Sequence, residues 1–174
     1  MQPLTTGETL THAQRVDLIR PGVPGPAGQV WADLGAGSGA FTLALLELLG
    51  EGGQVYAVDK NLRVPKHPRL HTLWGDFTKP LKIPLLDGIL MANSLHYVED
   101  KATLLKQLQT YLKPGGRLLV VEYANRRPNP WVPFPIAFSG LEEIATGTGL
   151  VARKVGDTPS DFGGEIYAAL LTRG

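Results

Sequence analysis

The sequence predicts an α/β domain with a doubly wound, mostly parallel sheet of seven strands and helices on both faces. Strand-like apolar runs alternate with helix-like segments over residues 30–124, which is the pattern of parallel βαβ units. The last two apolar runs have no helix between them, so we expect an antiparallel hairpin at one edge of the sheet. The chain has 174 residues, 43% of them hydrophobic and 19% charged, which fits one globular domain over residues 1–174.

The first predicted elements are a helix, a loop and a strand. Thr9 or Thr11 is suited to cap a helix that Pro21 ends. Residues 21–29 are rich in Pro and Gly and predict a loop. A buried strand follows and ends at residues 31–34.

The middle of the chain continues the alternation. The Leu-rich segment Phe41–Leu49 predicts a helix that ends at Gly50. The connection over residues 60–69 carries two prolines, so we expect only a stub of helix there. The remaining elements are strands at 54–58, 71–74, 87–92 and 117–123, and a helix at 101–112 that Lys-Pro-Gly-Gly ends.

The last third of the chain predicts one helix and two strands. Residues 128–135 contain four prolines and two aromatic residues and predict an irregular segment. Ser139 is suited to cap a helix through Ala145, with Glu142 completing a capping box. Strands at 151–155 and 165–172 then form the hairpin.

Composition excludes several functional classes. The balance of 17 basic and 16 acidic residues argues against a dedicated nucleic-acid binder. The absence of cysteine excludes thiolate nucleophiles, Cys-ligated zinc and disulfides, and we predict no metal site. No secretory pattern and no apolar run approaching the roughly 18 residues of a membrane span is present, so we expect a cytoplasmic protein without a membrane partner. One basic cluster is interpreted as a solvated loop, with RNA contact as the alternative: Lys60, Arg63, Lys66, His67 and Arg69.

A glycine run from Asp33 to Phe41 lies where a strand gives way to a helix. Glycines there let the backbone turn sharply and approach a ligand, and the helix N-terminus offers free N–H groups to an anion. With Ala40 as its last position, the run also satisfies the dinucleotide-binding fingerprint G-x-G-x-x-G/A. A tight turn that binds nothing is the third interpretation.

Three acids distinguish among these interpretations. Asp33 precedes Gly35 by two residues and is suited to a bound ammonium group rather than to a pyrophosphate. Asp59 ends the second strand and is placed to accept hydrogen bonds from ribose hydroxyls, which supports a nucleoside without choosing between the two ligand classes. Asp76 follows the third strand, where a carboxylate can accept from an adenine amino group. Because the carboxyl ends of parallel strands share one edge, the three acids predict a ligand crevice.

With these residues in place, the sequence resembles the class I S-adenosylmethionine-dependent methyltransferases, which have a Rossmann-like fold. The stretch from Asp33 to Gly39 resembles the first motif of that family. The other family motifs follow in the expected order: Val55–Asp59 as the second-strand acid, Gly75–Phe77 as the adenine-contacting turn, Asp87–Val98 as the fourth strand with its loop, and Leu112–Glu122 as the fifth strand.

The resemblance implies S-adenosyl-L-methionine as the cofactor, and it implies roles at the matching positions. The glycine run would pack against the methionine part and the ribose, Asp33 would hold the amino group, and Asp59 the ribose. Asn93 and Ser94 would line the methionine end. The complete set of implied cofactor-binding residues is Asp33, Gly35, Ala36, Gly37, Gly39, Asp59, Lys60, Asp76, Phe77, Asn93 and Ser94.

The methyl acceptor is expected to be a small, partly apolar molecule. His96 lies three residues past Asn93 and is the candidate base for a hydroxyl acceptor, although it could instead only pack against the loop. Candidate acceptor-binding residues lie on the same loop and after the fifth strand: Tyr97, Tyr123, Arg126, Trp131 and Phe134. Because the 60–69 connection and the N-terminal region are short, the acceptor pocket could be open or completed by a second subunit.

Three other functions remain open at this point. One is methylation of RNA or protein. The second is a nicotinamide-dependent oxidoreductase, and the third is a module that binds a cofactor, or none, without catalysis.

Overall fold

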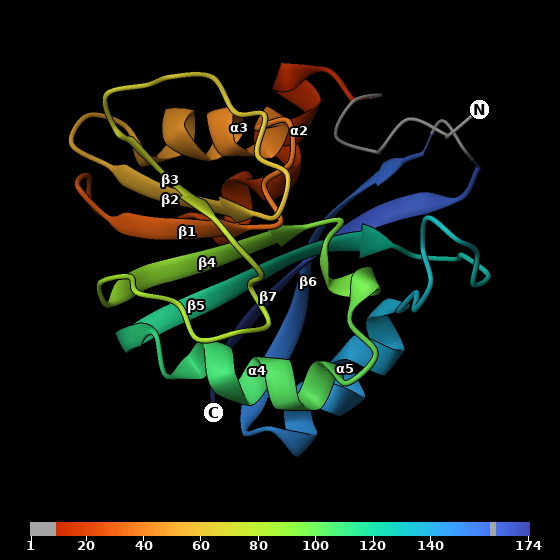
Figure 1. Ribbon diagram of the computed structural model, residues 1–174. Helices are drawn as coiled ribbons and strands as arrows, with labels where there is room; N and C mark the ends of the chain where they lie inside the picture. Colours follow the sequence, from red (N-terminus) through yellow and green to blue (C-terminus); the bar gives the residue numbers. More distant parts are fainter. Residues whose placement is uncertain (1–9, 161–162) are drawn as a thin grey trace.

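The computed structural model, which describes residues 10–160 and 163–174, confirms the doubly wound α/β fold. A seven-stranded sheet has the order β3-β2-β1-β4-β5-β7-β6 (Figure 1). Strands β1 to β5 run parallel, and β7 lies antiparallel between β5 and β6. The strands are β1 (Val30–Leu34), β2 (Gln54–Asp59), β3 (Leu70–Trp74), β4 (Leu86–Ala92), β5 (Leu112–Tyr123), β6 (Leu150–Pro159) and β7 (Glu165–Arg173).

Helices cover both faces of the sheet, as Figure 1 shows. Side chains alternate across a strand, so β5 places Leu119 and Val121 on one face and Leu118 and Val120 on the other. The first pair packs in the core beneath α2 (His12–Ile19) and α3 (Ala40–Leu49), and the second in the core beneath α4 (Lys101–Gln109) and α5 (Phe138–Gly147). Two short 3₁₀ helices complete the set: η1 (Arg20–Gly22) and η2 (Leu95–Tyr97).

The N-cap predicted for α2 is confirmed, whereas the N-cap predicted for α5 is wrong. Thr11 caps α2 in a reciprocal capping box with Gln14, while Thr9 lies outside the described residues. The Ser139 cap was wrong, because α5 starts at Phe138, two residues earlier than predicted, and has Ala137 as its N-cap without a side-chain hydrogen bond. Ser139 therefore lies within the first turn, where it cannot form the predicted box with Glu142.

The Lys-Pro-Gly-Gly segment was also misassigned. Helix α4 ends at Gln109, and β5 begins at Leu112 and runs through that segment. Leu86 pairs with Leu112 and Gly88 with Arg117, so an irregularity in the ladder accommodates the extra residues of β5. Pairing with β4 therefore outweighs the local turn preference of the two glycines.

The connection between β2 and β3 contains no helix at all, where the sequence predicted a stub. Residues 60–69 form turns and irregular backbone. In consequence β3 is a poorly covered edge strand, and Trp74 is 68% exposed. Among the described residues, no helix has the length and apolar content required to cross a membrane.

Candidate functional site

The glycine loop joins β1 to α3 and packs closely against the loop after β4. Gly35 has φ +81°, a conformation that side chains disfavour, and an added Cβ would lie 2.4 Å from Ser94 Cβ. The N–H groups of Gly35 and Ala36 both donate to the carbonyl of Val58 in β2. The loop is therefore held against β2 and β4 at once.

Asp59, the last residue of β2, holds the loop from the other side. Its carboxylate accepts the Gly37 N–H at 2.9 Å and the Asn61 N–H at 2.9 Å. A carboxylate oxygen can accept further hydrogen bonds, so these contacts orient Asp59 without exhausting its capacity. Asp59 is therefore fixed in orientation and can still accept hydrogen bonds from a ligand.

The segment Asn61–Pro65 crosses over the glycine loop, in the place where a helix was expected. The Arg63 N–H donates to the Gly37 carbonyl at 2.8 Å. An added Cβ on Gly39, which has φ +85°, would lie 3.0 Å from Val64 and 3.2 Å from Pro65. The segment therefore forms a close-fitting outer wall of the site.

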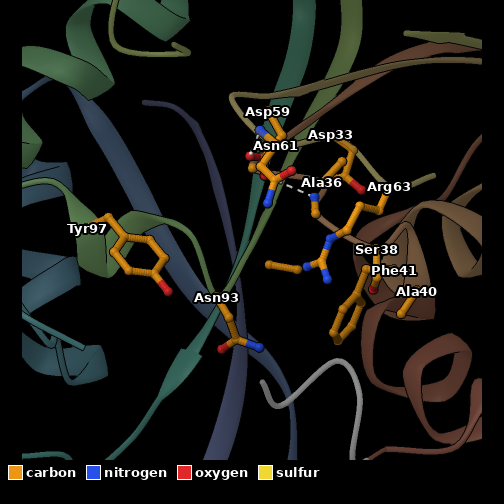
Figure 2. A pocket seen from close by; sticks show the side chains of 13 residues that line it. Asp33, Ala36, Ser38, Ala40, Phe41, Asp59, Asn61, Arg63, Asn93 and Tyr97 are labelled. Carbon is orange, nitrogen blue, oxygen red and sulfur yellow. Dashed lines mark hydrogen bonds between the residues drawn. The ribbon is translucent and has the colours of Figure 1, made fainter. Parts of the chain in front are cut away.

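Two adjacent cavities lie along the carboxyl ends of β1 to β4, where ligands bind in open α/β sheets. They share Gly35, Asp59 and Tyr97. The first cavity, of about 290 Å³ (Figure 2), is lined by Asp33, Gly35, Ala36, Gly37, Ser38, Ala40, Phe41, Asp59, Asn61, Arg63, Ala92, Asn93 and Tyr97. The second, of about 490 Å³, is lined by Gly35, Asp59, Lys60, Gly75, Asp76, Phe77, Thr78, Ser94, Tyr97 and Val98.

The first cavity contains buried polar atoms without partners. Asp33 accepts from the Thr42 hydroxyl at 2.6 Å through Oδ2, but its Oδ1 has no hydrogen-bond partner among the described residues. The same holds for both Oδ1 and Nδ2 of Asn93. Asn93 also has φ +56°, a conformation that is uncommon outside glycine and that concentrates at functional sites. Because unpaired buried polar atoms are costly, the three atoms indicate a polar ligand.

Burial also alters the charge of Asp33. Desolvation raises the pKa of its carboxyl to about 7, against the lowering effect of the Thr42 hydrogen bond. The nearby Asp59 carboxylate raises it further. A cationic group in the first cavity would relieve this cost by pairing with the ionised form.

The second cavity contains the predicted adenine-contacting turn. Asp76 Oδ1 accepts from the Thr78 hydroxyl and N–H, and Oδ2 lies 3.5 Å from Lys60 Nζ. These hydrogen bonds, the Thr78 hydroxyl first, together with Lys60, hold the pKa of Asp76 below its usual value. Ser94 lines this cavity instead of the first, and its hydroxyl donates to the Leu34 carbonyl at 2.6 Å.

His96, the candidate base, is buried beneath the loop and lines neither cavity. Its Nδ1 lies 2.9 Å from Glu122 Oε2, and its backbone N–H donates to Glu122 Oε1 at 3.0 Å. His96 is 3% exposed and Glu122 is fully buried. With a proton on Nδ1 facing Glu122, Nε2 of a neutral imidazole is the basic nitrogen.

Of the acceptor-binding candidates, the structure brings only Tyr97 to the walls of these two cavities. Tyr123 is buried under the Arg126 guanidinium, at 4.5 Å from its ring centre, and its ring centre lies 6.0 Å from that of His96. Phe134 is joined to the loop, because its N–H donates to the His96 carbonyl at 2.9 Å. Trp131 is partly exposed, in a turn where its N–H donates to the Asn129 side chain.

The remaining predicted cofactor-binding residues all line one of the two cavities except Gly39, which lies behind the loop against Val64. Sequence reasoning missed Arg63, which it had assigned to a solvated loop. The two prolines that shorten this connection were the available signal. The described residues contain no cluster of three or more His, Cys, Asp or Glu side chains suited to a metal ion.

The fold and site define an open α/β sheet with two adjoining cavities at the carboxyl ends of its strands, lined by Asp33, Asp59 and Asp76. The chain belongs to the methyltransferase domain family, whose model matches residues 32–118, half of the chain. This confirms the family resemblance drawn from the motifs.

Curated relatives include methyltransferases of quinone biosynthesis. Demethylmenaquinone methyltransferase from Streptomyces avermitilis is 32% identical over 143 residues, covering 79% of this chain and 57% of the relative. A ubiquinone biosynthesis O-methyltransferase from Xanthomonas axonopodis is 28% identical, with 69% and 52% covered. The chain thus spans about half the length of these relatives.

Solved structures agree on the fold. The calicheamicin-biosynthesis methyltransferase CalO1, in its S-adenosylhomocysteine-bound form, has a TM-score of 0.72 at 21% identity, covering 96% of this chain and 55% of CalO1. The magnesium protoporphyrin IX methyltransferase of Synechocystis has a TM-score of 0.71 at 16% identity, with 94% and 80% covered.

Proposed function

We propose that this protein is an S-adenosylmethionine-dependent methyltransferase that acts on a small, partly apolar molecule. The observation that carries this proposal is the set of three buried, unpartnered polar atoms of Asp33 and Asn93 in a cavity beside the glycine loop. Family membership and the methyltransferase names of the relatives support it.

The residues present fit the cofactor. Asp33 Oδ1 and Asn93 Oδ1 are acceptors for an ammonium group, and Asn93 Nδ2 is a donor for a carboxylate. Asp59 is oriented by the loop to accept ribose hydroxyls, and Asp76 is held ionised to accept an amino group in the second cavity. Gly35 and Asp59 border both cavities and would contact the part of the ligand that joins them.

When bound, the cofactor supplies a methyl group on a positively charged sulfur, which is already activated for displacement. The chain must therefore bind and orient the cofactor and the acceptor and must exclude water, because alignment alone supplies several orders of magnitude in rate. Asn93 and Tyr97 border the first cavity at the side of the loop after β4. A base is needed only where the acceptor atom carries a proton that it must lose.

We assign this role to His96, with Glu122 as the residue that orients it; because His96 is buried beneath the loop after β4, the role requires this loop to shift when the acceptor binds. The buried Glu122 carboxylate faces Nδ1 and leaves Nε2 as the nitrogen that takes the proton. The aromatic rings of Tyr97 and Tyr123 next to His96 support an apolar acceptor. Phe134 is joined to His96 through its backbone, and the Arg126 guanidinium lies over the Tyr123 ring. We include Trp131 in the same proposed acceptor subsite.

Isothermal titration calorimetry with S-adenosylhomocysteine tests the proposed function. We expect saturable binding at one site per chain. A folded protein that gives no heat at millimolar S-adenosylhomocysteine would overturn the assignment.

The acceptor class is tested by methyl transfer to quinols and phenols in parallel with RNA and protein. For a hydroxyl acceptor, we expect His96→Ala to lower turnover about 10²- to 10⁴-fold with little change in cofactor affinity. Transfer to RNA or protein alone would contradict the acceptor class.

The proposal also includes a cytoplasmic location and self-association, which cell fractionation and light scattering of the purified protein will test.

A further inference from the structure

Arg63 is the only cationic side chain on the first cavity, among the residues that the structure describes. The other charged groups on its wall are Asp33 and Asp59. Figure 2 shows the Arg63 side chain directed into the cavity, with Asn93 and Tyr97 on the opposite side. No ion pair joins its guanidinium to any described residue.

The backbone of Arg63 is held against the glycine loop. The Arg63 N–H is bonded to the Gly37 carbonyl at 2.8 Å, and the preceding residue, Leu62, is buried. The following residues, Val64 and Pro65, pack against Gly39. The backbone at Arg63 is therefore fixed to the glycine loop, although the residue is exposed.

A second cationic feature lies on the same wall. Helix α3 has ten residues and no side-chain cap at its N-terminus, and no acidic residue lies in its first turn. Its first residues, Ala40 and Phe41, line the cavity. The positive end of the helix dipole and the Arg63 guanidinium thus both favour an anion in this cavity.

The cavity therefore presents complementary charges. The unpartnered Oδ1 of Asp33 favours a cationic group, whereas Arg63 and the N-terminus of α3 favour an anionic group. An α-amino carboxylate carries both groups on one carbon. The planar fork of a guanidinium matches a carboxylate through two parallel hydrogen bonds.

We propose that Arg63 is the carboxylate-binding residue of this site and pairs with the methionyl carboxylate of the cofactor. This inference rests on the proposed function. It assigns a cofactor-selecting role to a connection that lacks the helix expected between β2 and β3.

The test compares two ligands that differ in this carboxylate. S-adenosylhomocysteine carries the amino-acid group, and 5′-methylthioadenosine keeps the nucleoside and sulfur but lacks it. We expect Arg63→Gln to weaken S-adenosylhomocysteine binding about 10- to 100-fold and to leave 5′-methylthioadenosine binding unchanged. Arg63→Lys keeps the charge without the fork, so we expect an intermediate loss.

The matched control is Lys66→Gln, which removes a positive charge from the same connection at an exposed residue that lies outside this cavity. We expect no change for either ligand. If Arg63→Gln weakens both ligands equally, or neither, the carboxylate assignment is overturned. If it alters only the affinity for a methyl acceptor, Arg63 belongs to the acceptor subsite and the assignment is also overturned. Failure of the unmodified protein to bind S-adenosylhomocysteine would instead contradict the proposed function itself.

Discussion

At the scale of single residues, Asp33 couples the charge of the site to the stability of the fold. Burial raises its pKa from 3.8 to about 7, so between these pH values the folded chain keeps a proton that the unfolded chain has lost. The free energy of unfolding therefore decreases as the pH rises from about 4 to about 7, because Asp33 ionises less readily in the folded chain. Above about pH 7 the contribution of Asp33 to this free energy is constant.

Asp33→Asn removes this ionisation while keeping the shape of the side chain. We expect the variant to gain stability relative to the unmodified protein between pH 5 and pH 8. Urea denaturation of both proteins at the two pH values measures this difference. A difference in unfolding free energy that does not grow with pH would contradict the buried-carboxyl account.

The same carboxyl predicts how ligand binding depends on pH. An ammonium group pairs with ionised Asp33, so below pH 7 the carboxyl must lose a proton when the ligand binds. We expect S-adenosylhomocysteine affinity to fall as the pH drops from 7 to 5, by at most about tenfold per pH unit. Asp33→Asn should bind more weakly and show no such slope in calorimetric titrations.

Asp59 is the second residue for which we predict a direct effect on binding. Asp59→Ala removes a charged acceptor for ribose hydroxyls and also releases the Gly37 N–H. We expect binding of S-adenosylhomocysteine to weaken by about 1–3 kcal/mol with the fold retained. Asp157→Ala, an exposed position on β6, is the control. An unchanged dissociation constant for Asp59→Ala would remove this residue from the site.

At the scale of elements, one buried lysine ties α4 to the irregular segment after β5. Lys101 Nζ donates to the Val98 carbonyl at 2.7 Å and to the Phe134 carbonyl at 2.8 Å. Desolvation lowers the pKa of this amine. The contacts hold the aromatic segment beside η2, next to the proposed acceptor subsite.

We predict that Lys101→Met destabilises the protein by about 1–3 kcal/mol, because two carbonyls lose their donor while the side-chain length is kept. Lys106→Met on the exposed face of the same helix is the control and should have little effect. Chemical denaturation of the two variants decides the question. Equal stabilities would show that the buried amine does not hold the segment.

The elements also show where local sequence signals were sufficient. The glycine run and the strand-end acids Asp59 and Asp76 were predictable because each position has a local chemical requirement. Asn93 was implied by the family resemblance, and the structure adds its left-handed backbone conformation. Arg63 was not singled out, since its position depends on the path of the chain over the loop. The start of β5 was missed for a related reason, because the Leu112 pairing with Leu86 is a tertiary contact.

At the scale of the whole molecule, binding should be visible as stabilisation. A ligand at a hundredfold excess over its dissociation constant stabilises the folded state by about 2.7 kcal/mol. For a domain of this size, that corresponds to a rise in Tm of roughly 5–10 °C. We expect this shift with S-adenosylhomocysteine and none with NAD.

A differential scanning fluorimetry series with both ligands checks this expectation. A shift with NAD alone would favour the oxidoreductase interpretation of the glycine run.

The overall topology was predictable because the alternation of apolar runs persists along the whole sheet. The pairing of β7 with β5 could not be predicted from the sequence. A hairpin at the sheet edge leaves open which of its two strands pairs with β5 and which forms the outer edge.

The position of β7 between β5 and β6 has a consequence for synthesis on the ribosome. Strand β5 is translated by residue 123, but its antiparallel neighbour is not made until residues 165–173, roughly forty residues later. At about 5–20 residues per second, this interval lasts a few seconds. During it, one edge of a strongly apolar strand has no native partner, and such edges template aggregation. The nascent chain in this interval is therefore the stage at which chaperones would protect the protein most.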